Sequence, residues 1–367
     1  MKVSIRIAVL LAAPVVLSPV RALADDKHDR GGSILGDLPT SPERIVSTVP
    51  ANNDVNPYGV AFVPEGFGGG GPLHPGDILV SNFNNSMNLQ GTGTTIVRIT
   101  PGGALSVFFQ GEPGLGLTTA LGVLRGGFVL VGNLPTTDGT SATVQQGSLL
   151  VIDRFGHLVS TLADASLLDG PWDLTINDQG KFAQVFVSNV LSGTITRLDV
   201  FADDDHFHVA GATQIAHGYM HRTDPAALVI GPTGLAYNQH RDVLYVASTG
   251  DNEIFAIPFA RETHTDNGQG VVIYKDDTHL HGPLGLALAP NGNLITANGD
   301  AVNAGGTQNA LVEFTPQGKF VAQFQVDPGA GGGAFGLAFS GGNGDVRFAA
   351  VDDDQNTLDI WNVQRDH

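Results

Sequence analysis

The stretch Gly282-Pro283-Leu284-Gly285-Leu286-Ala287 recurs in varied form along the chain and decides its fold. In each copy a special or small residue precedes a short apolar strand, a turn follows, and a second apolar strand usually ends in Asn. The other copies are Asn56-Pro57-Tyr58-Gly59-Val60-Ala61-Phe62, Gly170-Pro171-Trp172-Asp173-Leu174, Gly231-Pro232-Thr233-Gly234-Leu235-Ala236, Gly332-Gly333-Ala334-Phe335-Gly336-Leu337-Ala338-Phe339 and the degenerate Thr118-Thr119-Ala120-Leu121. Repeats of about 40 to 60 residues that are rich in short strands predict propeller blades.

We take the residue aligned with Gly285 as the mark of each repeat. The six marks are Gly59, Ala120, Asp173, Gly234, Gly285 and Gly336. Each interval holds four runs that read as strands, which in the fifth repeat are 284–289, 293–297, 310–315 and 320–324. The sequence therefore predicts an all-β, six-bladed β-propeller with four-stranded antiparallel blades.

The sixth repeat is too short to supply its own fourth strand, because only six residues follow Trp361. Residues 44–49, Arg-Ile-Val-Ser-Thr-Val, match the fourth-strand run 157–162 of the second repeat. We therefore expect an N-terminal strand to complete the last blade, which closes the ring and removes an exposed strand edge. The prediction is one propeller domain over residues 43–367.

The first residues have the pattern of a secretory signal peptide. A short basic region with Lys2 and Arg6 precedes an apolar run over 7–17, and Ala22-Leu23-Ala24 forms a small-x-small cleavage site. We expect residues 1–24 to be removed, residues 25–42 to be a flexible leader, and the protein to be exported to the periplasm or secreted. No later stretch has the about twenty apolar residues of a membrane span, so we expect no membrane insertion.

Composition narrows the class of partner. The chain has 36 acidic and 18 basic residues and a formal charge of −18, which disfavours binding to nucleic acid. It contains no cysteine, so stability after export must come from burial and strand pairing without disulfides. We expect a monomer whose partner is an unknown small molecule, glycan or protein.

Blade geometry places the residues before the marks on one face, around the mouth of the central channel. Three of them are aromatic: Tyr58, Trp172 and Phe335. Such a ring can stack on a sugar or a planar ligand. Large residues at these positions can equally wedge adjacent blades together.

A second ring on this face is predicted at the ends of the second strands. Its asparagines are Asn82, Asn133, Asn189 and Asn298. Amides can bind a polyhydroxylated ligand or give oxygen to a cation, but Asn also locks turns by bonding to nearby backbone.

Acidic and histidine side chains are expected near the same mouth. Asp169, Asp300 and Asp352 are candidate ligands for a divalent cation, and calcium suits such oxygen donors best. The candidates for a general acid, a general base or a metal ligand are His281, His217 and His221. The alternative is that all of these are polar loop residues.

The repeat resembles those of NHL-repeat proteins and the wider group of TolB-like six-bladed propellers. The resemblance rests on the Pro-x-Gly-apolar-Ala phrase and on later turns such as Thr315-Pro316-Gln317-Gly318 and Thr100-Pro101-Gly102-Gly103. It covers about residues 44–361. It implies the fold and leaves the activity open, because this group includes lactonases, lyases and binding modules.

The gluconolactonase-type members of this group hold one divalent metal with a Glu, an Asn and an Asp. In this chain, Asp169-Gly170-Pro171-Trp172 resembles the phrase that carries the Glu. Thr233 and Leu284 stand where the Asn and the Asp would be expected, and Leu cannot bind a metal. The resemblance to lyases rests on His281 and His217, but the chain lacks the blade number of those enzymes.

The sequence favours an exported propeller that binds a ligand or partner at the channel mouth. No catalytic activity can be demonstrated from the sequence. The alternative is a divalent-metal-dependent hydrolase, lactonase or lyase that uses the same mouth. A third reading, a purely structural surface protein, predicts a mouth plugged by side chains and no concave polar pocket.

Overall fold

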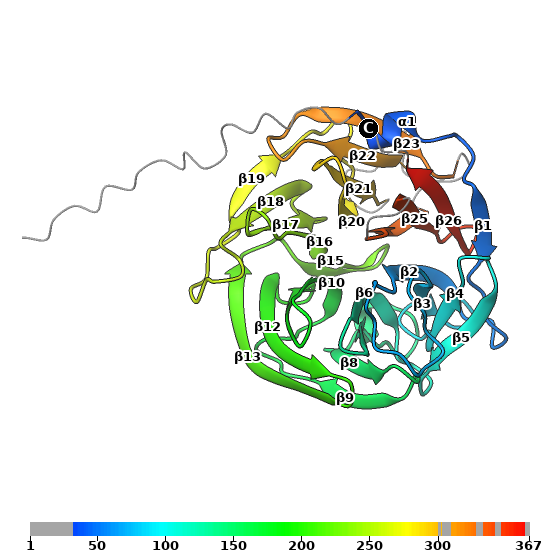
Figure 1. Cartoon of the computed structure of the whole chain (residues 1–367). Helices are drawn as coiled ribbons and strands as arrows, with labels where there is room; N and C mark the ends of the chain where they lie inside the picture. Colours follow the sequence, from blue (N-terminus) through cyan, green and yellow to red (C-terminus); the bar gives the residue numbers. More distant parts are fainter. Residues whose placement is uncertain (1–31, 300–301, 303–309, 328–332, 342–345, 364–367) are drawn as a thin grey trace, which may run out of the picture. The chain divides into compact units, whose positions relative to one another are not determined.

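The described residues form β-sheets that are arranged in a ring around a central axis (Figure 1). The computed structural model describes residues 32–299, 302, 310–327, 333–341 and 346–363. Within these residues there are six four-stranded antiparallel sheets and one two-stranded hairpin. The predicted six-bladed β-propeller is therefore confirmed. None of the described helices is long and apolar enough to cross a membrane.

Each blade begins with its innermost strand and continues outward. Blades one and two comprise β2 (Val55–Phe62), β3 (Ile78–Asn84), β4 (Thr95–Ile99), β5 (Leu105–Gln110), β6 (Leu117–Leu124), β7 (Phe128–Asn133), β8 (Ser148–Asp153) and β9 (Leu158–Leu162). Blades three and four comprise β10 (Pro171–Asp178), β11 (Phe182–Asn189), β12 (Thr194–Asp203), β13 (His206–His217), β16 (Pro232–Asn238), β17 (Val243–Ser248), β18 (Glu253–Pro258) and β19 (Val271–Tyr274).

Blades five and six complete the ring. Their strands are β20 (Pro283–Leu288), β21 (Leu294–Asn298), β22 (Ala310–Phe314), β23 (Phe320–Gln325), β24 (Ala334–Phe339), β25 (Val346–Asp352), β26 (Thr357–Val363) and β1 (Arg44–Ser47). Three short elements lie outside the blades: α1 (Ile34–Asp37), the 3-10 turn η1 (Ser141–Thr143), and the hairpin β14 (Arg222–Asp224) and β15 (Leu228–Ile230).

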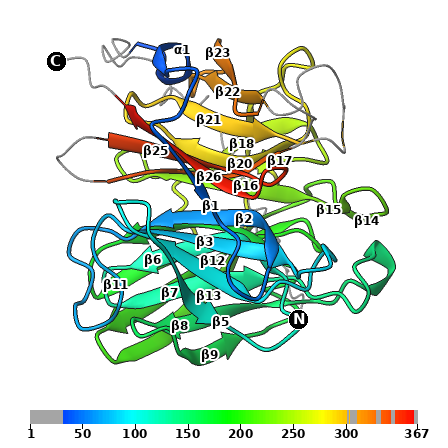
Figure 2. The ribbon, with the colours of Figure 1, turned by 90° about the vertical axis from the view of Figure 1, so that its right-hand side faces the viewer.

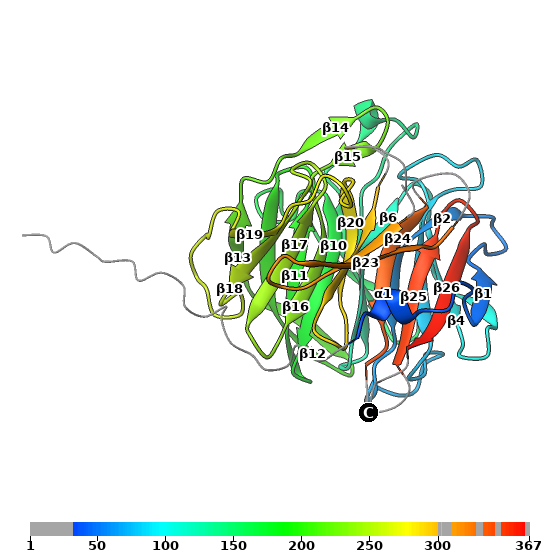
Figure 3. The ribbon, with the colours of Figure 1, turned by 90° about the horizontal axis from the view of Figure 1, so that it is seen from above.

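The N-terminal strand closes the ring, as the sequence predicts. β1 pairs with β26 in an antiparallel register that sets Arg44 opposite Ile360 and Ser47 opposite Thr357. Figure 3 shows β1 beside β26. This pairing gives blade six its fourth strand, so the first and last described strands of the chain belong to one sheet.

The marks of the repeat are positions where adjacent inner strands approach closely. A Cβ atom built on Gly285 would lie 2.1 Å from the carbonyl oxygen of Phe335 in the next blade, and one on Gly336 would lie 2.1 Å from that of Tyr58. A Cβ on Gly234 would lie 2.2 Å from the carbonyl oxygen of Leu284. Only glycine permits such an approach, so packing between blades accounts for three of the six marks.

Hydroxyl groups near the marks join several of the inner strands to a neighbouring blade. Thr118 donates a hydrogen bond to the carbonyl of Pro171 (2.8 Å), and Thr233 donates one to the carbonyl of Pro283 (2.9 Å). Ser188 donates to the carbonyl of Thr233 (2.7 Å). The repeated motif therefore contributes contacts that hold adjacent blades together around the channel.

The hydrophobic core lies between the faces of adjacent blades. Every residue of β3, β7 and β17 is buried, because both faces of a blade are covered by its neighbours. Between blades one and two, Leu79 and Ile96 pack in one cluster with Leu121 and Val131.

Part of the predicted flexible leader is docked on the propeller. Glu313 of β22 is fully buried, and its carboxylate accepts hydrogen bonds from the Ser33 hydroxyl (2.8 Å) and the backbone N–H groups of Ile34 (3.1 Å) and Leu35 (2.8 Å). The side chain of Trp361 donates to the Pro39 carbonyl at 3.1 Å. Residues 33–39 are thus fixed by buried contacts, whereas the limits of 1–24 and 25–42 remain predictions because residues 1–31 lie outside the described part.

Candidate functional site

The three aromatic residues predicted at the channel mouth lie together. The ring centroids of Tyr58 and Phe335 are 4.2 Å apart in a stacked arrangement, and those of Tyr58 and Trp172 are 5.7 Å apart edge to face. Phe83 joins them, stacked on Tyr58 at 4.5 Å. Tyr58 and Trp172 belong to blades one and three, which are not neighbours, so their contact crosses the channel.

These side chains close the channel at this face. Tyr58 and Trp172 are 5% and 4% exposed, and Phe83, Leu134 and Val190 are fully buried in the same cluster. We call this group, with Phe335, the aromatic plug. Its geometry is that of a packed core, and ligand binding by its aromatic rings remains a prediction.

A hairpin covers the aromatic plug. β14 and β15 project from the face where the inner strands begin (Figure 2), and Leu228 and Val229 of β15 pack into the plug. The hairpin comes from the segment that leads into blade four. No repeated pattern in the sequence indicates it, because within the described residues only this blade carries such a hairpin.

The predicted asparagines at the second-strand ends anchor the chain near the starts of the inner strands. Asn189 donates to the Leu167 carbonyl (3.0 Å) and accepts from the Asp169 N–H (3.2 Å). Asn298 accepts from the His281 N–H at 2.9 Å and donates to the His279 carbonyl at 2.8 Å. These amides act as the turn locks that we considered as the alternative to ligand binding.

Asn82 and Asn133 are also buried. Asn82 donates to the Thr48 carbonyl at 3.1 Å, and Asn133 accepts from the Ser148 hydroxyl at 2.7 Å. Their exposed fractions are 0% and 5%. A contact between these amides and a ligand stays a prediction that the structure does not test.

The three candidate histidines have different surroundings. His217 is exposed and its Nδ1 lies 2.7 Å from Asp266 Oδ1, while Nδ1 of exposed His221 lies 2.9 Å from the Tyr219 carbonyl. His281 is buried at 8% exposure. Within the described residues, no group of three or more His, Asp or Glu side chains converges to hold a metal ion.

Two of the three candidate acids lie in the described part of the chain. Asp169 is half-buried, and burial raises its pKa, an effect that nearby His221 partly offsets. Asp352 is 3% exposed and accepts a hydrogen bond from the Gln355 N–H; burial raises its pKa too. Asp300 lies outside the described residues.

The residues around the aromatic plug do not fit the metal that gluconolactonase-type propellers hold. Thr233 is 3% exposed and its hydroxyl bonds to the Pro283 carbonyl, while Leu284 has only an aliphatic side chain. Asp169 therefore lacks the Asn and the Asp that would complete the metal ligands of such a site.

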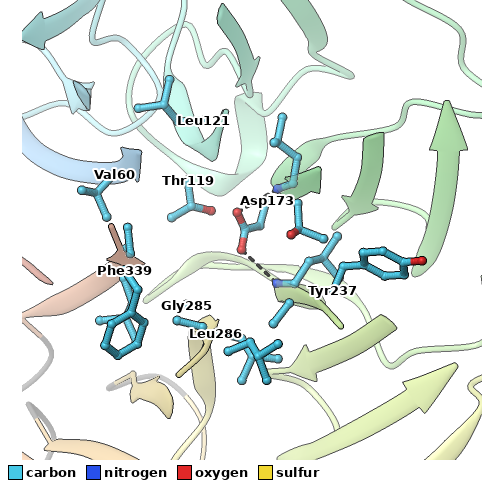
Figure 4. Close-up of a pocket in the computed structure, with 17 residues that line it drawn as sticks. Val60, Thr119, Leu121, Asp173, Tyr237, Gly285, Leu286 and Phe339 are labelled. Atoms are coloured by element: carbon cyan, nitrogen blue, oxygen red, sulfur yellow. Dashed lines mark hydrogen bonds between the residues drawn. The ribbon is translucent and has the colours of Figure 1, made fainter. Parts of the chain in front are cut away.

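A cavity lies in the channel on the other side of the aromatic plug. It has a volume of about 240 Å³ and extends from Thr119 and Asp173 to Leu288 and Phe339, the last residues of β20 and β24 (Figure 4). The remaining lining residues are Val60, Leu121, Leu174, Thr175, Leu235, Ala236, Tyr237, Gly285, Leu286, Ala287, Gly336, Leu337 and Ala338.

Asp173 gives this cavity its carboxyl group. Oδ1 accepts a hydrogen bond from the Leu174 N–H at 2.7 Å, and Oδ2 accepts one from the Leu235 N–H at 3.0 Å (Figure 4). Burial raises the pKa of Asp173 well above its usual range, although these two N–H groups oppose the shift. The side chain can therefore change between a proton donor and a charged acceptor at a pH well above that of an exposed aspartate.

Backbone groups add to the polarity of the cavity. The six inner strands are each the last strand of their sheet, so each is paired on one side only. An edge strand presents unpaired N–H and C=O groups, and here these edges face the channel. Several of the lining residues have small side chains, among them Ala236, Gly285 and Ala338.

Asp173 does not stand out in the sequence as a site residue, because it occupies the mark position of the third repeat. The available signal was an acid at a position where the other five repeats have Gly or Ala. A charged residue at an inner-strand position of close packing is unexpected unless it has a specific partner.

Comparison with known proteins agrees with this architecture. No family model and no curated protein matches the sequence. A gluconolactonase structure from Xanthomonas campestris is 14% identical, with a TM-score of 0.53, over 90% of this chain and 91% of that chain. The calcium-binding protein regucalcin from Agrobacterium tumefaciens strain C58 is 14% identical, with a TM-score of 0.52, over 88% of this chain and 96% of its own.

A third similar structure has a different assignment. It is a putative oxidoreductase (glucose dehydrogenase) from Thermus thermophilus, 13% identical, with a TM-score of 0.52, over 86% of this chain and 99% of that chain. The chain has a propeller fold. At these identities the similarity shows the fold and does not carry over an activity.

Proposed function

We propose that the protein binds a small polar molecule in the channel cavity, against the carboxyl group of Asp173. The observation that supports this most is the position of Asp173. Among the described residues that line the cavity, it has the only carboxyl group, and it stands where the other repeats have Gly or Ala. A few polar groups in a concave, preformed space are typical of small-molecule sites.

The cavity limits the size and chemistry of the ligand. Its volume of about 240 Å³ is smaller than the roughly 300 to 1,000 Å³ of sites for drug-sized molecules. Hydroxyl groups both donate and accept, and so they complement the exposed N–H and C=O edges of the inner strands. We therefore propose a ligand no larger than a monosaccharide that carries several hydroxyl groups. It would enter from the face where the inner strands end.

Calorimetry and thermal unfolding with D-glucose, myo-inositol and glycerol as probes test this proposal. We expect at least one probe to bind the native protein and to raise its melting temperature, because a ligand present at 100 times its Kd stabilises by about 2.7 kcal/mol. Asp173→Asn should weaken that binding, and Ala338→Leu should abolish it by filling the cavity.

Asp178→Asn is the matched control, because Asp178 is on the same strand but does not line the cavity. It should bind the probe as the native protein does. Failure of all three probes to bind, or equal binding to the native protein and Ala338→Leu, would exclude this site for hydroxylated molecules.

We further propose that the protein is exported as a monomer. The basic, apolar and small-residue pattern of residues 1–24 supports export. N-terminal sequencing of the mature protein should find Asp25 first. A mature protein that retains Met1 would contradict export by this signal, and a dimer in size-exclusion chromatography would contradict the monomer.

A divalent-metal-dependent lactonase or lyase is the alternative proposal. Its support is the proximity of half-buried Asp169 and His221, together with the fold shared with the gluconolactonase structure. Thr233 and Leu284 argue against the metal ligands that such enzymes use. Hydrolysis of glucono-1,5-lactone that a chelator stops, and that Asp169→Asn abolishes, would favour the alternative over simple binding.

A further inference from the structure

The carboxyl group in the channel cavity has no positively charged side chain beside it. Asp173 is half-buried, so its side chain remains accessible from the cavity (Figure 4). None of the described residues that line the cavity is Lys, Arg or His. The six inner strands, β2, β6, β10, β16, β20 and β24, contain no such residue either. The wall of the channel therefore supplies a negative group and no counter-charge.

The strands with the most extensive contacts to β10 do not supply a counter-charge. β6, β7, β11 and β16 contain one titratable side chain, Tyr237, whose hydroxyl donates to Asp242 Oδ1 at 2.8 Å. Asp178, the other acid of β10, lies 3.5 Å from its own partner, Arg125. Asp173 is thus met by two backbone N–H groups, which donate hydrogen bonds but carry no net charge.

These surroundings favour a positively charged occupant of the cavity. A carboxylate among apolar side chains and neutral backbone groups is unfavourable unless an opposite charge lies close to it. The attraction between two such charges is also stronger here than in bulk water. The chain as a whole has a formal charge of −18, which favours the approach of cations to the protein.

The polar groups of the cavity suit an amine better than a metal ion. Hard divalent cations require several oxygen ligands, and in the described part of the chain no three His, Asp or Glu side chains converge to bind one. A protonated primary amine has three N–H donors and no acceptor. One donor can bind the Asp173 carboxylate, and the others can bind carbonyl groups at the edges of the inner strands.

We propose that the channel cavity binds a small hydroxylated molecule that carries a protonated primary amine, such as an amino sugar, and that the amine pairs with the Asp173 carboxylate. This inference rests on the proposed binding function of the same cavity and adds the chemical class of its ligand. The pairing couples binding to pH, because protonation of Asp173 removes the charge that attracts the amine.

D-glucosamine and D-glucose are a matched pair of probes, because at pH 6.5 they differ by an ammonium group in place of one hydroxyl. We expect calorimetry to show that the native protein binds glucosamine at least about tenfold more tightly, since a hydrogen bond to a charged group is stronger than a neutral one. Asp173→Asn should bind the two sugars with equal affinity. The control Asp178→Asn should keep the native preference, because Asp178 does not line the cavity.

The pH dependence of binding to the native protein gives a test that needs no variant. Burial raises the pKa of Asp173 well above its usual range, so pairing with the amine must displace a proton in weakly acidic solution. From pH 5 to pH 6.5, the affinity for glucosamine should therefore rise more than the affinity for glucose. The heat of glucosamine binding should also change with the ionisation enthalpy of the buffer.

The outcomes separate this inference from the function on which it rests. Equal affinities of the native protein for the two sugars would overturn the pairing with an amine and leave binding in the cavity standing. A preference for glucosamine that persists in Asp173→Asn would also overturn it. Binding of neither sugar would overturn the inference, and failure of myo-inositol and glycerol as well would overturn the proposed function with it.

Discussion

The carboxylate of Asp173 in blade three accepts a hydrogen bond from the backbone N–H of Leu235 in blade four, at 3.0 Å. This contact links two inner strands that form no ladder with each other. It also holds the carboxyl group at the wall of the channel cavity. The residue is thus part of the packing between blades and part of the candidate site.

Asp173→Ala should destabilise the protein by about 1 to 3 kcal/mol, because the N–H groups of Leu174 and Leu235 lose their acceptor. The loss should be larger in acid. Burial raises the pKa of Asp173, so its contribution is fully present below the usual value of 3.8 and declines as the pH rises through the folded-state pKa. Urea unfolding of both proteins from pH 4 to pH 8 measures this. A difference that grows with pH would contradict the expectation.

Gly285→Ala should destabilise the protein by about 3 kcal/mol, because the new Cβ would lie 2.1 Å from the Phe335 carbonyl oxygen. The backbone of β24 would have to move away to accommodate it. Gly69→Ala is the control, since nothing lies within 4 Å of a Cβ at that position. Its unfolding free energy should change by no more than about 0.5 kcal/mol. Equal effects in chemical denaturation would show that the close approach is unimportant.

The sequence predicts the number of blades, the inner strands and the closing strand. Each follows from a packing or pairing requirement that recurs from blade to blade. Gly285 and Gly336 recur because adjacent inner strands approach too closely for a side chain. The closing strand could be inferred because blade six lacks a fourth strand in its own segment. These structural requirements therefore produce a periodic pattern in the sequence.

The hairpin that covers the plug and the docked leader could not be predicted in the same way, because each occurs once among the described residues. Nothing in Leu228 or Val229 indicates that they pack across the channel. Glu313 left a faint signal as a charged residue in the apolar run 310–314, but its partners in the leader are about 280 residues away in the sequence. Contacts of this range depend on the finished ring.

Trp172→Ala should destabilise the protein by about 3 to 5 kcal/mol if the aromatic plug is a packed core, since it leaves a cavity beside the stacked rings of Tyr58 and Phe83. Phe182→Ala is the matched control, because that side chain is 62% exposed. Thermal and urea unfolding compare the two. A Trp172→Ala protein of native stability that has lost binding to a sugar would instead support the aromatic platform that the sequence suggested.

Glu313→Ala should release the leader and destabilise the protein by about 3 kcal/mol or more, because several buried donors lose a charged acceptor. Glu313→Gln keeps the shape of the side chain and should cost less. Limited proteolysis should cut residues 33–39 faster in both variants. The control Glu65→Ala removes an exposed side chain and should leave the cleavage rate unchanged.

Asp359→Asn should make the protein less sensitive to pH between about 4 and 6. Burial, and then the carboxylates of Asp352 and Asp327, raise the pKa of Asp359 to about 6, while the Thr357 hydroxyl lowers it. The folded state therefore binds this proton more tightly than the unfolded chain. Stability present below the usual pKa of 3.8 is lost as the pH rises through 6.

Relative to the native protein, the Asp359→Asn variant should gain about 2 kcal/mol between pH 4 and pH 7. Denaturant unfolding at pH 4, 5, 6 and 7 gives the two curves. Parallel curves would mean that Asp359 does not titrate in this window.

The pairing of β1 with β26 also dictates the order in which the molecule can assemble. Arg44–Ser47 are among the first described residues to leave the ribosome, yet their partners in Thr357–Val363 are among the last. Blades one to five can form as they are synthesised, whereas blade six must wait for the end of translation. Until then the inner strands of blades one and six cannot meet, so a truncated chain remains an open arc with two exposed edges.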